Sequence, residues 1–370
     1  MKTNILTQIA ITSALRHCER SEAIHRKKHF IWIASFLAMT SCLLTSCEKE
    51  IEFKGEQTDP KLVINSIVEP GQPVKARISK SVFFLDNEQN TEAPDDLVAT
   101  LFVNGNRIGE MMPQTDTVWS TQDYWSFENE YSVWKVYALP YCPAVGDEVK
   151  ITASAKGFDD VEGSTGALPD LPNCQIKDIR LIDTESWPVS IDMGDTTWQY
   201  YDTYELSLEI TDTHPGQTDF YKLSMDQSYH FFEDYDHYQY HWAAYINDYD
   251  DPIFGTVSLG DLDLIDYQMS APNGTFTDQF FDGRSYTIKL PIGFSYPKFE
   301  GLVPEGCRVA IYLEHITKDY YNYLNTCNQG DEVDQFFAEP IQTHTNVNGG
   351  YGIVGGRMVD MLWLELPVEE

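Results

Sequence analysis

Histidines and carboxylates occur closest together in residues 230–241, HFFEDYDHYQYH. His230, His237 and His241 offer imidazole nitrogens, and Asp234 offers a carboxylate among them. These ligand types suit zinc, copper or nickel. A spacing of four residues puts His237 and His241 on one side of either a helix or a strand. The segment therefore predicts a transition-metal site, and the alternative is a polar, aromatic hairpin edge or loop on an acidic protein.

A second candidate cation site is the sequence NDYDDP, which contains Asp248, Asp250 and Asp251. Calcium is a hard cation that takes several oxygen ligands, so three neighbouring carboxylates could bind it. The spacing is not that of an EF-hand loop, and an Asp-Pro turn has the same composition without a metal. A divalent metal, either calcium or a transition metal, is thus the one cofactor class that the sequence suggests.

Tyrosines and tryptophans alternate with acidic residues in residues 119–134 and 235–245. Amphipathic rings of this kind stack on sugars and anchor protein interfaces. Core packing accounts for some of them, but rings that lie between acids cannot all be buried. We expect a ligand-binding face that draws on the following side chains: Tyr124, Trp125, Trp134, Tyr235, Tyr238, Tyr240 and Trp242.

The familiar motifs of nucleophilic and metal-dependent catalysis do not occur in the sequence, which contains neither GxSxG nor HExxH. Residues 350–355, GYGIVG, have the letters of a dinucleotide fingerprint. That mechanism needs a helix N-terminus after the glycines, and here an alternating strand pattern follows. Acids are so numerous that a catalytic pair of carboxylates stays open. The sequence favours binding over catalysis.

Acidic residues dominate the chain, which has 370 residues, 25 Lys and Arg, and 58 Asp and Glu. Six of the basic residues and two of the acids precede Cys47, so the rest carries 19 basic and 56 acidic residues, a net charge near −37. Such a charge repels nucleic acid and anionic lipid headgroups, which excludes nucleic acid as a partner. It suits a cationic ligand or calcium, or it serves solubility alone.

An apolar run, Phe30–Cys47, follows three basic residues and ends in Leu-Thr-Ser-Cys. This order is typical of a secretory signal. The end of the run resembles the lipobox of bacterial lipoproteins, which implies cleavage before Cys47 and acylation of its thiol and its amine. Alternatives are cleavage at Cys42 and a single membrane-spanning helix, which needs roughly 17–25 residues. We therefore expect a signal peptide over 1–46, with 1–25 belonging to a start site placed too far upstream.

A lipidated tether is expected over residues 47–60. Its first residues, Glu48-Lys49-Glu50, resemble the acidic surface-export signal of Bacteroidetes lipoproteins, although a lysine interrupts the acids. The resemblance implies a lipid-anchored protein of the outer membrane that faces the cell surface. A merely solvated tether, with the domain on the periplasmic side, is the alternative.

Four cysteines follow the lipidated one: Cys142, Cys174, Cys307 and Cys327. An even number in an exported protein is compatible with two disulfides, and none of the four has the CxxC spacing of a zinc site. Three pairings are open. We expect sequence neighbours to pair, which joins Cys142 to Cys174 and Cys307 to Cys327.

Apolar residues alternate with polar ones along most of the chain after residue 61, which predicts strands. The clearest examples are 61–68, 73–82, 97–103, 133–139, 147–155, 176–183, 203–211, 219–226, 285–292, 307–317 and 358–366. Asn104-Gly105 predicts a hairpin turn. Thr317 can cap a short helix over 318–327, and a second short helix is expected over 331–337. The chain is predicted to be all-β.

The domain organisation follows from these strands and from the glycines and prolines between them. Residues 61–162 are expected to form an immunoglobulin-like β-sandwich. Residues 163–174, GSTGALPDLPNC, lack alternation and predict a linker. Residues 175–370 are expected to form a larger β-rich domain, sandwich or barrel-like, with one or two short helices.

Three stretches carry a family resemblance: NGTFTDQFFDGRSYTIKL from Asn273, ITKDYYNYL from Ile316 and FFAEPIQTHTNVNGGYGIVGGRM from Phe336. Together they resemble the domain-of-unknown-function 4249 family of Bacteroidetes lipoproteins. Its signature falls here on Glu339, Pro340, Asn346, Asn348 and Gly349. These positions suggest a structural role, because Asn and Gly tolerate positive φ, and residues 346–356, NVNGGYGIVGG, are expected to form a string of tight turns before the last strand.

The resemblance implies a location and a neighbourhood more than a chemistry. Members are outer-membrane lipoproteins, commonly encoded beside TonB-dependent transporters, and the resemblance supplies no catalytic residue. The leading hypothesis is therefore a ligand-binding accessory of a TonB-dependent transporter. A structural or adhesive envelope protein, and a hydrolase that uses carboxylates or a metal, are the alternatives.

Overall fold

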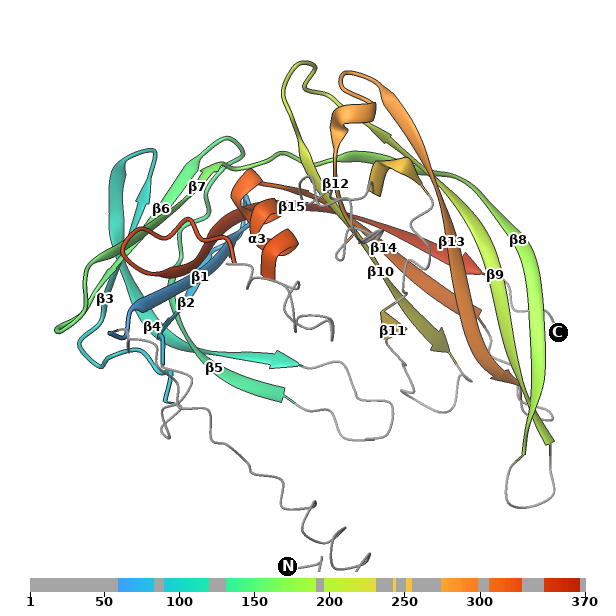
Figure 1. The fold of residues 1–370 in the computed structure, drawn as a ribbon, viewed down its shortest axis with the longest axis horizontal. Helices are drawn as coiled ribbons and strands as arrows, with labels where there is room; N and C mark the ends of the chain where they lie inside the picture. The colour runs from blue at the N-terminus through green and yellow to red at the C-terminus, as the bar shows by residue number, and fades with distance from the viewer. Residues whose placement is uncertain are drawn as a thin grey trace, which may run out of the picture. The chain divides into compact units, whose positions relative to one another are not determined.

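We describe the fold from a computed structural model, in which the placed residues are 59–82, 90–119, 131–190, 196–230, 242–243, 251–254, 274–298, 306–327 and 343–366 (Figure 1). The chain divides into residues 1–57 and 58–370, and every placed residue belongs to the second unit. The expected signal peptide, Cys47 and most of the tether lie outside the described residues. Within the described part, no helix has the length and apolar character to span a bilayer.

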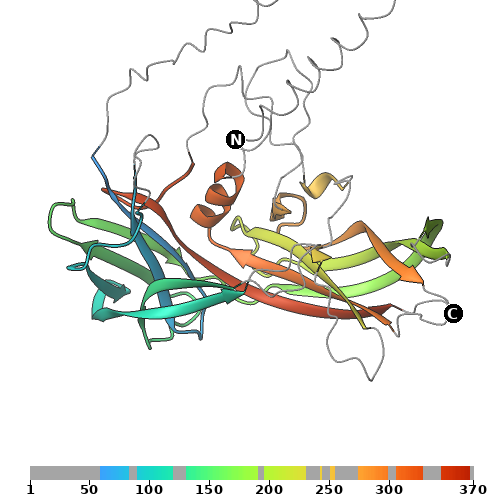
Figure 2. The same ribbon diagram turned by 90° about the horizontal axis from the view of Figure 1, so that it is seen from below.

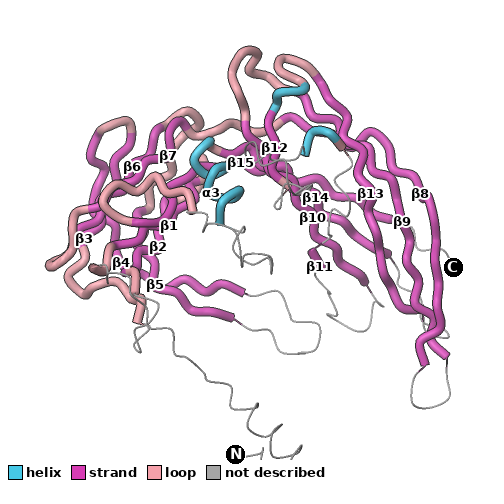
Figure 3. The backbone as a smooth tube through the Cα atoms, viewed as in Figure 1, coloured by secondary structure: helices cyan, strands magenta, loops and turns pink. Residues whose placement is uncertain are grey.

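Strands account for nearly all of the regular structure (Figure 3). In chain order they are β1 (Leu62–Val68), β2 (Val74–Lys80), β3 (Val98–Val103), β4 (Asn106–Trp119), β5 (Tyr131–Leu139), β6 (Glu148–Ser154), β7 (Val161–Ala167), β8 (Asn173–Ser190), β9 (Thr196–Thr211), β10 (Phe220–His230), β11 (Trp242–Ala243), β12 (Thr275–Thr277), β13 (Ser285–Lys298), β14 (Gly306–Ile316) and β15 (Tyr351–Leu366). The helical elements described are η1 (Pro252–Phe254), η2 (Asp278–Phe280) and α3 (Lys318–Cys327). The prediction of an all-β chain is confirmed.

The described strands form two sheets. The larger has the order β11-β10-β14-β15-β1-β2-β5-β4-β3-β6-β7, with β12 also paired to β10, and the smaller has the order β13-β9-β8. Neither order returns to its first strand, so the described strands do not close a barrel. The immunoglobulin-like topology of the N-terminal part stays a prediction.

Two apolar cores lie against these sheets. The first core is built from inward residues of β1 to β7, such as Leu62, Ile64 and Leu101, which are fully buried. The second core is built from β9, β10, β13 and β14 with η1, and Leu206 and Ile311 are fully buried in it. The strict alternation of buried and half-buried residues along β1 shows why a period of two in the sequence predicts the strands correctly.

β15 links the two cores. Its first residues pair in parallel with β1, and the rest pairs antiparallel with β14 (Figure 2). Val354 is therefore buried in the first core, and Leu366 is buried in the second. A parallel pair cannot be joined by a short hairpin, and here the connection between β1 and β15 comprises most of the chain. The C-terminal strand therefore completes a core whose other strands come from the N-terminal part.

Several local predictions hold in the structure. Asn104 and Gly105 have φ of +49° and +77° and turn the chain between β3 and β4. The predicted helix over 318–327 is α3, and its neighbour Thr317 accepts a hydrogen bond at Oγ1 from Gly356 N, 3.0 Å away. This bond ties the start of α3 to β15. The second predicted helix, 331–337, lies outside the described residues.

Two local predictions need correction. Residues 163–167 of the expected linker belong to β7 and pair with β6, so only 168–172 connect strands. The glycines after Gly350 do not form a string of turns but lie in β15. They are small because neighbours lie close: a Cβ at Gly355 would be 2.7 Å from Tyr320 Cβ of α3, and one at Gly356 would be 2.5 Å from the Leu168 side chain. Glycine is needed at these two positions because neighbouring atoms lie close, and not because the chain turns there.

Gly352 gives the sharpest test of the parallel pairing. It has φ +103°, and a Cβ there would collide with the Ile64 carbonyl oxygen. We expect Gly352→Ala to lower the free energy of unfolding by about 3 kcal/mol or more in urea titrations. Gly71→Ala is the control, because Gly71 has φ +79° but nothing lies within 4 Å of the position that its Cβ would take, so only backbone strain of about 1 kcal/mol applies. Equal losses in the two variants would contradict the close approach of β1 and β15.

Candidate functional site

The histidine cluster predicted for a transition metal is only partly placed. His230 ends β10 opposite Gly306 of β14. His237, His241 and Asp234 lie outside the described residues. The transition-metal site therefore stays a prediction.

The predicted calcium site of NDYDDP is placed at one residue, Asp251, while Asp248 and Asp250 lie outside the described residues. Asp251 Oδ1 accepts hydrogen bonds from Ile253 N at 3.1 Å and from the Tyr286 hydroxyl at 2.7 Å. Its Oδ2 accepts one from Lys289 N at 3.4 Å. These bonds fasten η1 to β13, so the Asp251 carboxylate already has a structural role.

Of the expected aromatic face, Trp134 and Trp242 are placed, while Tyr124, Trp125, Tyr235, Tyr238 and Tyr240 lie outside the described residues. Trp242 is in β11, opposite Gln227. The Trp134 ring is half-buried, and the Arg77 guanidinium lies 3.2 Å from its centroid. An arginine of the same chain therefore covers this ring, which leaves it unsuited to stack on a ligand from that side.

The described residues of the family signature, Asn346, Asn348 and Gly349, contact backbone groups just before β15. Asn346 Nδ2 donates to the carbonyl oxygens of Ser164 and Val354, both at 2.8 Å, and its Oδ1 accepts from Val354 N at 2.9 Å. Asn348 pairs through its backbone with Glu162, and a Cβ at Gly349 would lie 2.7 Å from the Asp160 carbonyl oxygen. These positions hold β7 against β15. Glu339 and Pro340 lie outside the described residues.

Asn346 and Asn348 form a matched pair for testing this role. Asn346→Ala removes three hydrogen bonds and leaves backbone groups unpaired, so we expect a loss of about 2–3 kcal/mol in the free energy of unfolding. Asn348→Ala removes an exposed side chain and keeps the backbone bonds, so we expect a change of about 0.5 kcal/mol or less. Denaturant titrations monitored by tryptophan fluorescence measure both. Similar losses would show that the Asn346 amide is not what holds the two strands.

The cysteines are placed differently from the predicted pairing. Cys142 and Cys174 are free thiols in the structure, so the disulfide expected between them is not formed there. Cys142 is exposed, whereas Cys174 is half-buried and its Sγ lies 3.4 Å from Asp360 Oδ2. Burial, with the charge of Asp360 and the hydrogen bond to it, raises the pKa of Cys174 to about 12. The pairing of Cys307 with Cys327 stays a prediction.

Thiol reactivity tests this assignment. At pH 8 a pKa near 12 leaves about 10⁻⁴ of Cys174 as the reactive thiolate, so we expect iodoacetamide to modify exposed Cys142 at least about 100-fold faster. Asp360→Asn removes the negative charge that contributes to the raised pKa of Cys174 and should accelerate modification of Cys174 alone. Peptide mass mapping without reductant measures both rates. A peptide that links Cys142 to Cys174 would contradict the free thiols.

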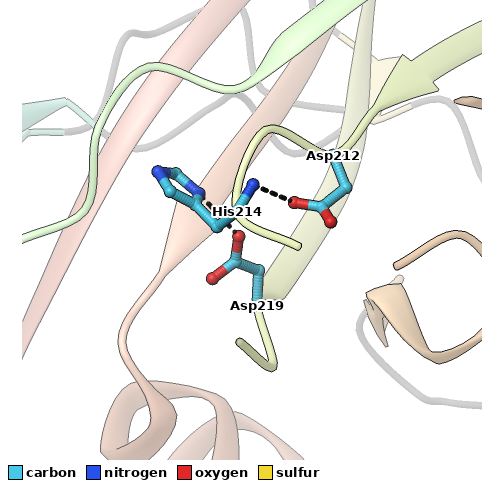
Figure 4. Close-up of side chains that lie close together, drawn as sticks. All are labelled: Asp212, His214 and Asp219. Carbon is cyan, nitrogen blue, oxygen red and sulfur yellow. Dashed lines mark hydrogen bonds and ion pairs between the residues drawn. The ribbon is translucent and has the colours of Figure 1, made fainter. Parts of the chain in front are cut away.

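Two groups of three potential ligand side chains in the described part lie elsewhere, where the turn after β9 meets the segment from η2 to β13. Asp212, His214 and Asp219 come from the first turn, DTHPGQTD, and offer ligand atoms within 4.8 Å of one another (Figure 4). His214 N donates to Asp212 Oδ1 at 2.8 Å, which closes the turn locally. Asp212, Asp278 and Asp282 form a second such trio across the two turns.

His214 and His315 connect the turn to the linker between β7 and β8. His214 Nδ1 is 2.9 Å from Asp219 Oδ2, and its Nε2 is 3.4 Å from Asp170 Oδ2. His315 Nδ1 is 3.1 Å from both the carbonyl and a carboxylate oxygen of Asp170, and its Nε2 is 3.6 Å from Asp219 Oδ1. Both nitrogens of each ring therefore face oxygen atoms, which leaves neither imidazole a nitrogen for a metal.

The same contacts shift the pKa values of Asp219 and His315. Burial by itself raises the pKa of Asp219, but hydrogen bonds from His315, Gln217 and His214 outweigh it and bring the pKa to about 2. Burial by itself lowers the pKa of His315, but the contacts with Asp219 and Asp170 outweigh it and raise the pKa. Asp219 and His315 are thus an ion pair that lies beside the stacked ring of Tyr221, 5.2 Å from His315.

The second trio, Asp212, Asp278 and Asp282, includes a buried carboxylate oxygen without a hydrogen-bond partner among the described residues. Asp212 is buried, and its two carboxylate oxygens accept hydrogen bonds from His214 N and Gly283 N. Asp282 is exposed and accepts one from Gly216 N at 2.6 Å. Asp278 is 2% exposed, and among the described residues nothing hydrogen-bonds its Oδ2. Burial raises the pKa of Asp278, and the charges of Asp219 and Asp212 add to the rise.

Sequence reasoning missed both trios. The segment DTHPGQTD carries a signal, since two aspartates and a histidine surround a Pro-Gly turn. No such signal marks Asp170, Asp278 or His315, because they are distant from one another in sequence and each lies in an ordinary strand or linker pattern. His315 and Asp170, which are in contact, are separated by 145 positions.

The fold and the site define an all-β protein with a cluster of acidic residues and histidines between its two sheets. The cluster lies where the turn after β9 of the smaller sheet meets η2, which follows β12 of the larger sheet, and we call this place the seam. The family model described as Domain of unknown function (DUF4249) matches residues 48–361. The chain belongs to this family, which confirms the resemblance in the motifs. No curated protein matches the chain.

Proposed function

We propose that the chain is a lipid-anchored outer-membrane protein that acts by binding, as an accessory of a TonB-dependent transporter. The lipobox-like end of Phe30–Cys47 supports the anchor, and the acids after Cys47 support exposure at the cell surface. The partner is supported by the resemblance of the chain to a family whose members are commonly encoded beside TonB-dependent transporters.

The observation that carries the proposal is a row of exposed apolar side chains on the outer face of β15, Met361 and Trp363, which we call the β15 row. Their exposed fractions are 45% and 57%. The residues between and beside them, Leu362 and Leu364, point the other way and pack on the second core. The alternation of β15 therefore places a large tryptophan and a methionine in water, on a strand whose opposite face is already occupied.

Exposed tryptophan and methionine are common anchors of protein interfaces. Across the sheet, Trp363 pairs with Ala310, which is buried, and Met361 pairs with Tyr312, which is half-buried, so the exposed apolar area is centred on β15. Its rim is charged, since Arg308 and Glu365 form an exposed ion pair at 3.0 Å beside it. A partner with an apolar patch and a basic surround fits this face of a chain whose net charge is −33.

The tether makes a small interface sufficient. A protein held beside its partner by a lipid anchor has a high effective concentration, so a weak contact can hold the two together. The β15 row, with two apolar side chains and a charged rim, would make a weak contact of this sort.

Co-purification from native membranes tests the proposal. We expect a barrel transporter to be recovered with the wild-type protein, and Met361→Ser with Trp363→Ser to reduce that recovery at least about tenfold, because hot-spot truncations remove about 2 kcal/mol or more. Val133→Ser is the control, since Val133 is 60% exposed on β5 and lies outside the β15 row. Recovery of wild type without any transporter would favour a structural or adhesive envelope role instead.

A further inference from the structure

We propose that Asp212, Asp278 and Asp282 bind a calcium ion at the seam between the two sheets. One carboxylate oxygen from each residue lies within 4.8 Å of those of the other two. Oxygens that share a calcium ion at roughly 2.3–2.6 Å can be at most about 5 Å apart, so the three fit around a single ion.

Asp278 is the observation that points to a ligand rather than to a chance gathering of acids. Its side chain is 2% exposed, and its Oδ2 is buried without a hydrogen-bond partner in the described part of the chain. Buried carboxylate oxygens are normally satisfied, because losing water without a replacement is costly. A cation bound between the three aspartates supplies the missing partner.

The neighbouring backbone arranges the other two ligands. Gly283 N and His214 N donate to Asp212, and Gly216 N donates to Asp282. Each of these oxygens keeps a second lone pair for an ion. Gly283 can make this contact because it has φ +66° and lies against Pro215, which a larger residue would strike. The two turns are thus held in position before any ion binds.

The donor set selects the class of metal. Three carboxylates and no nitrogen or sulfur suit a hard cation, and calcium accepts irregular oxygen cages that magnesium does not. The other trio is less suitable, because both ring nitrogens of His214 already face carboxylates. The site also differs from the calcium site predicted at Asp248–Asp251, since Asp251 is committed to backbone and tyrosine donors.

An ion at this position would join segments of both sheets. Asp212 follows β9 of the smaller sheet, whereas Asp278 follows β12, which pairs with β10 of the larger sheet. Neutralising three carboxylates there would reduce the repulsion between the two turns. The expected consequence is a chain whose thermal stability rises with calcium concentration.

Calcium titration of the purified protein tests the site. We expect calcium chloride to raise the Tm of the wild type, and isothermal titration calorimetry to give one site per chain. Asp278→Asn keeps the shape of the side chain but removes a charged ligand, so we expect the calcium affinity to fall at least about tenfold. Asp282→Asn, on an exposed turn, should weaken binding in the same way without disturbing the core.

Asp95→Asn is the control, because it removes the same charge from an exposed residue next to the first core. We expect it to keep the wild-type affinity. An unchanged calcium response in Asp278→Asn and Asp282→Asn, or a wild type that does not respond to millimolar calcium, would overturn the proposal. A response lost only in Asp251→Asn would overturn it in favour of the site predicted from NDYDDP.

Discussion

The parallel pairing of β15 with β1 is the constraint on which the described fold depends. One strand reaches both cores, with Val354 in the first and Leu366 in the second. The backbones approach closely at Gly350 and Gly352, where a Cβ would strike the carbonyl oxygens of Leu62 and Ile64 in β1. Gly355 and Gly356 lie instead against Tyr320 of α3 and the Leu168 side chain. Asn346 then ties the start of the strand to β7 through Ser164. The described signature residues, Asn346, Asn348 and Gly349, lie at this junction, and their contacts there are with the backbone of neighbouring segments.

A second junction, at the seam of the two sheets, is held by charge instead of by close packing. Asp219 and His315 form a buried ion pair, and Asp170 extends it to the segment after β7. Buried ion pairs of this kind are stable only when further hydrogen bonds satisfy the charged groups, and here Gln217 and His214 provide them. Asp278 is the exception at the seam, because its Oδ2 has no such donor among the described residues. The proposed calcium ion accounts for that exception.

The two faces of β15 separate stability from binding. Leu362 and Leu364 face the second core, while Met361 and Trp363 face water. Since a strand alternates its side chains, a substitution on one face leaves the other nearly unchanged. The β15 row could therefore change its partner without loss of the fold. Our proposed binding function uses this independence, whereas the proposed calcium site contributes to the stability of the seam.

The sequence by itself determined the all-β class, the Asn104-Gly105 hairpin, α3 and the family. These depend on local periodicity, on turn chemistry and on contiguous motifs, which a linear pattern records. Only the tertiary structure decided that β15 pairs with β1, that Cys142 and Cys174 stay apart as thiols, and that Asp212, Asp278 and Asp282 meet. Alternation states which face of a strand is buried, but it does not state which distant strand lies beside it. Sites built from two turns depend on that pairing, so they became visible only in three dimensions.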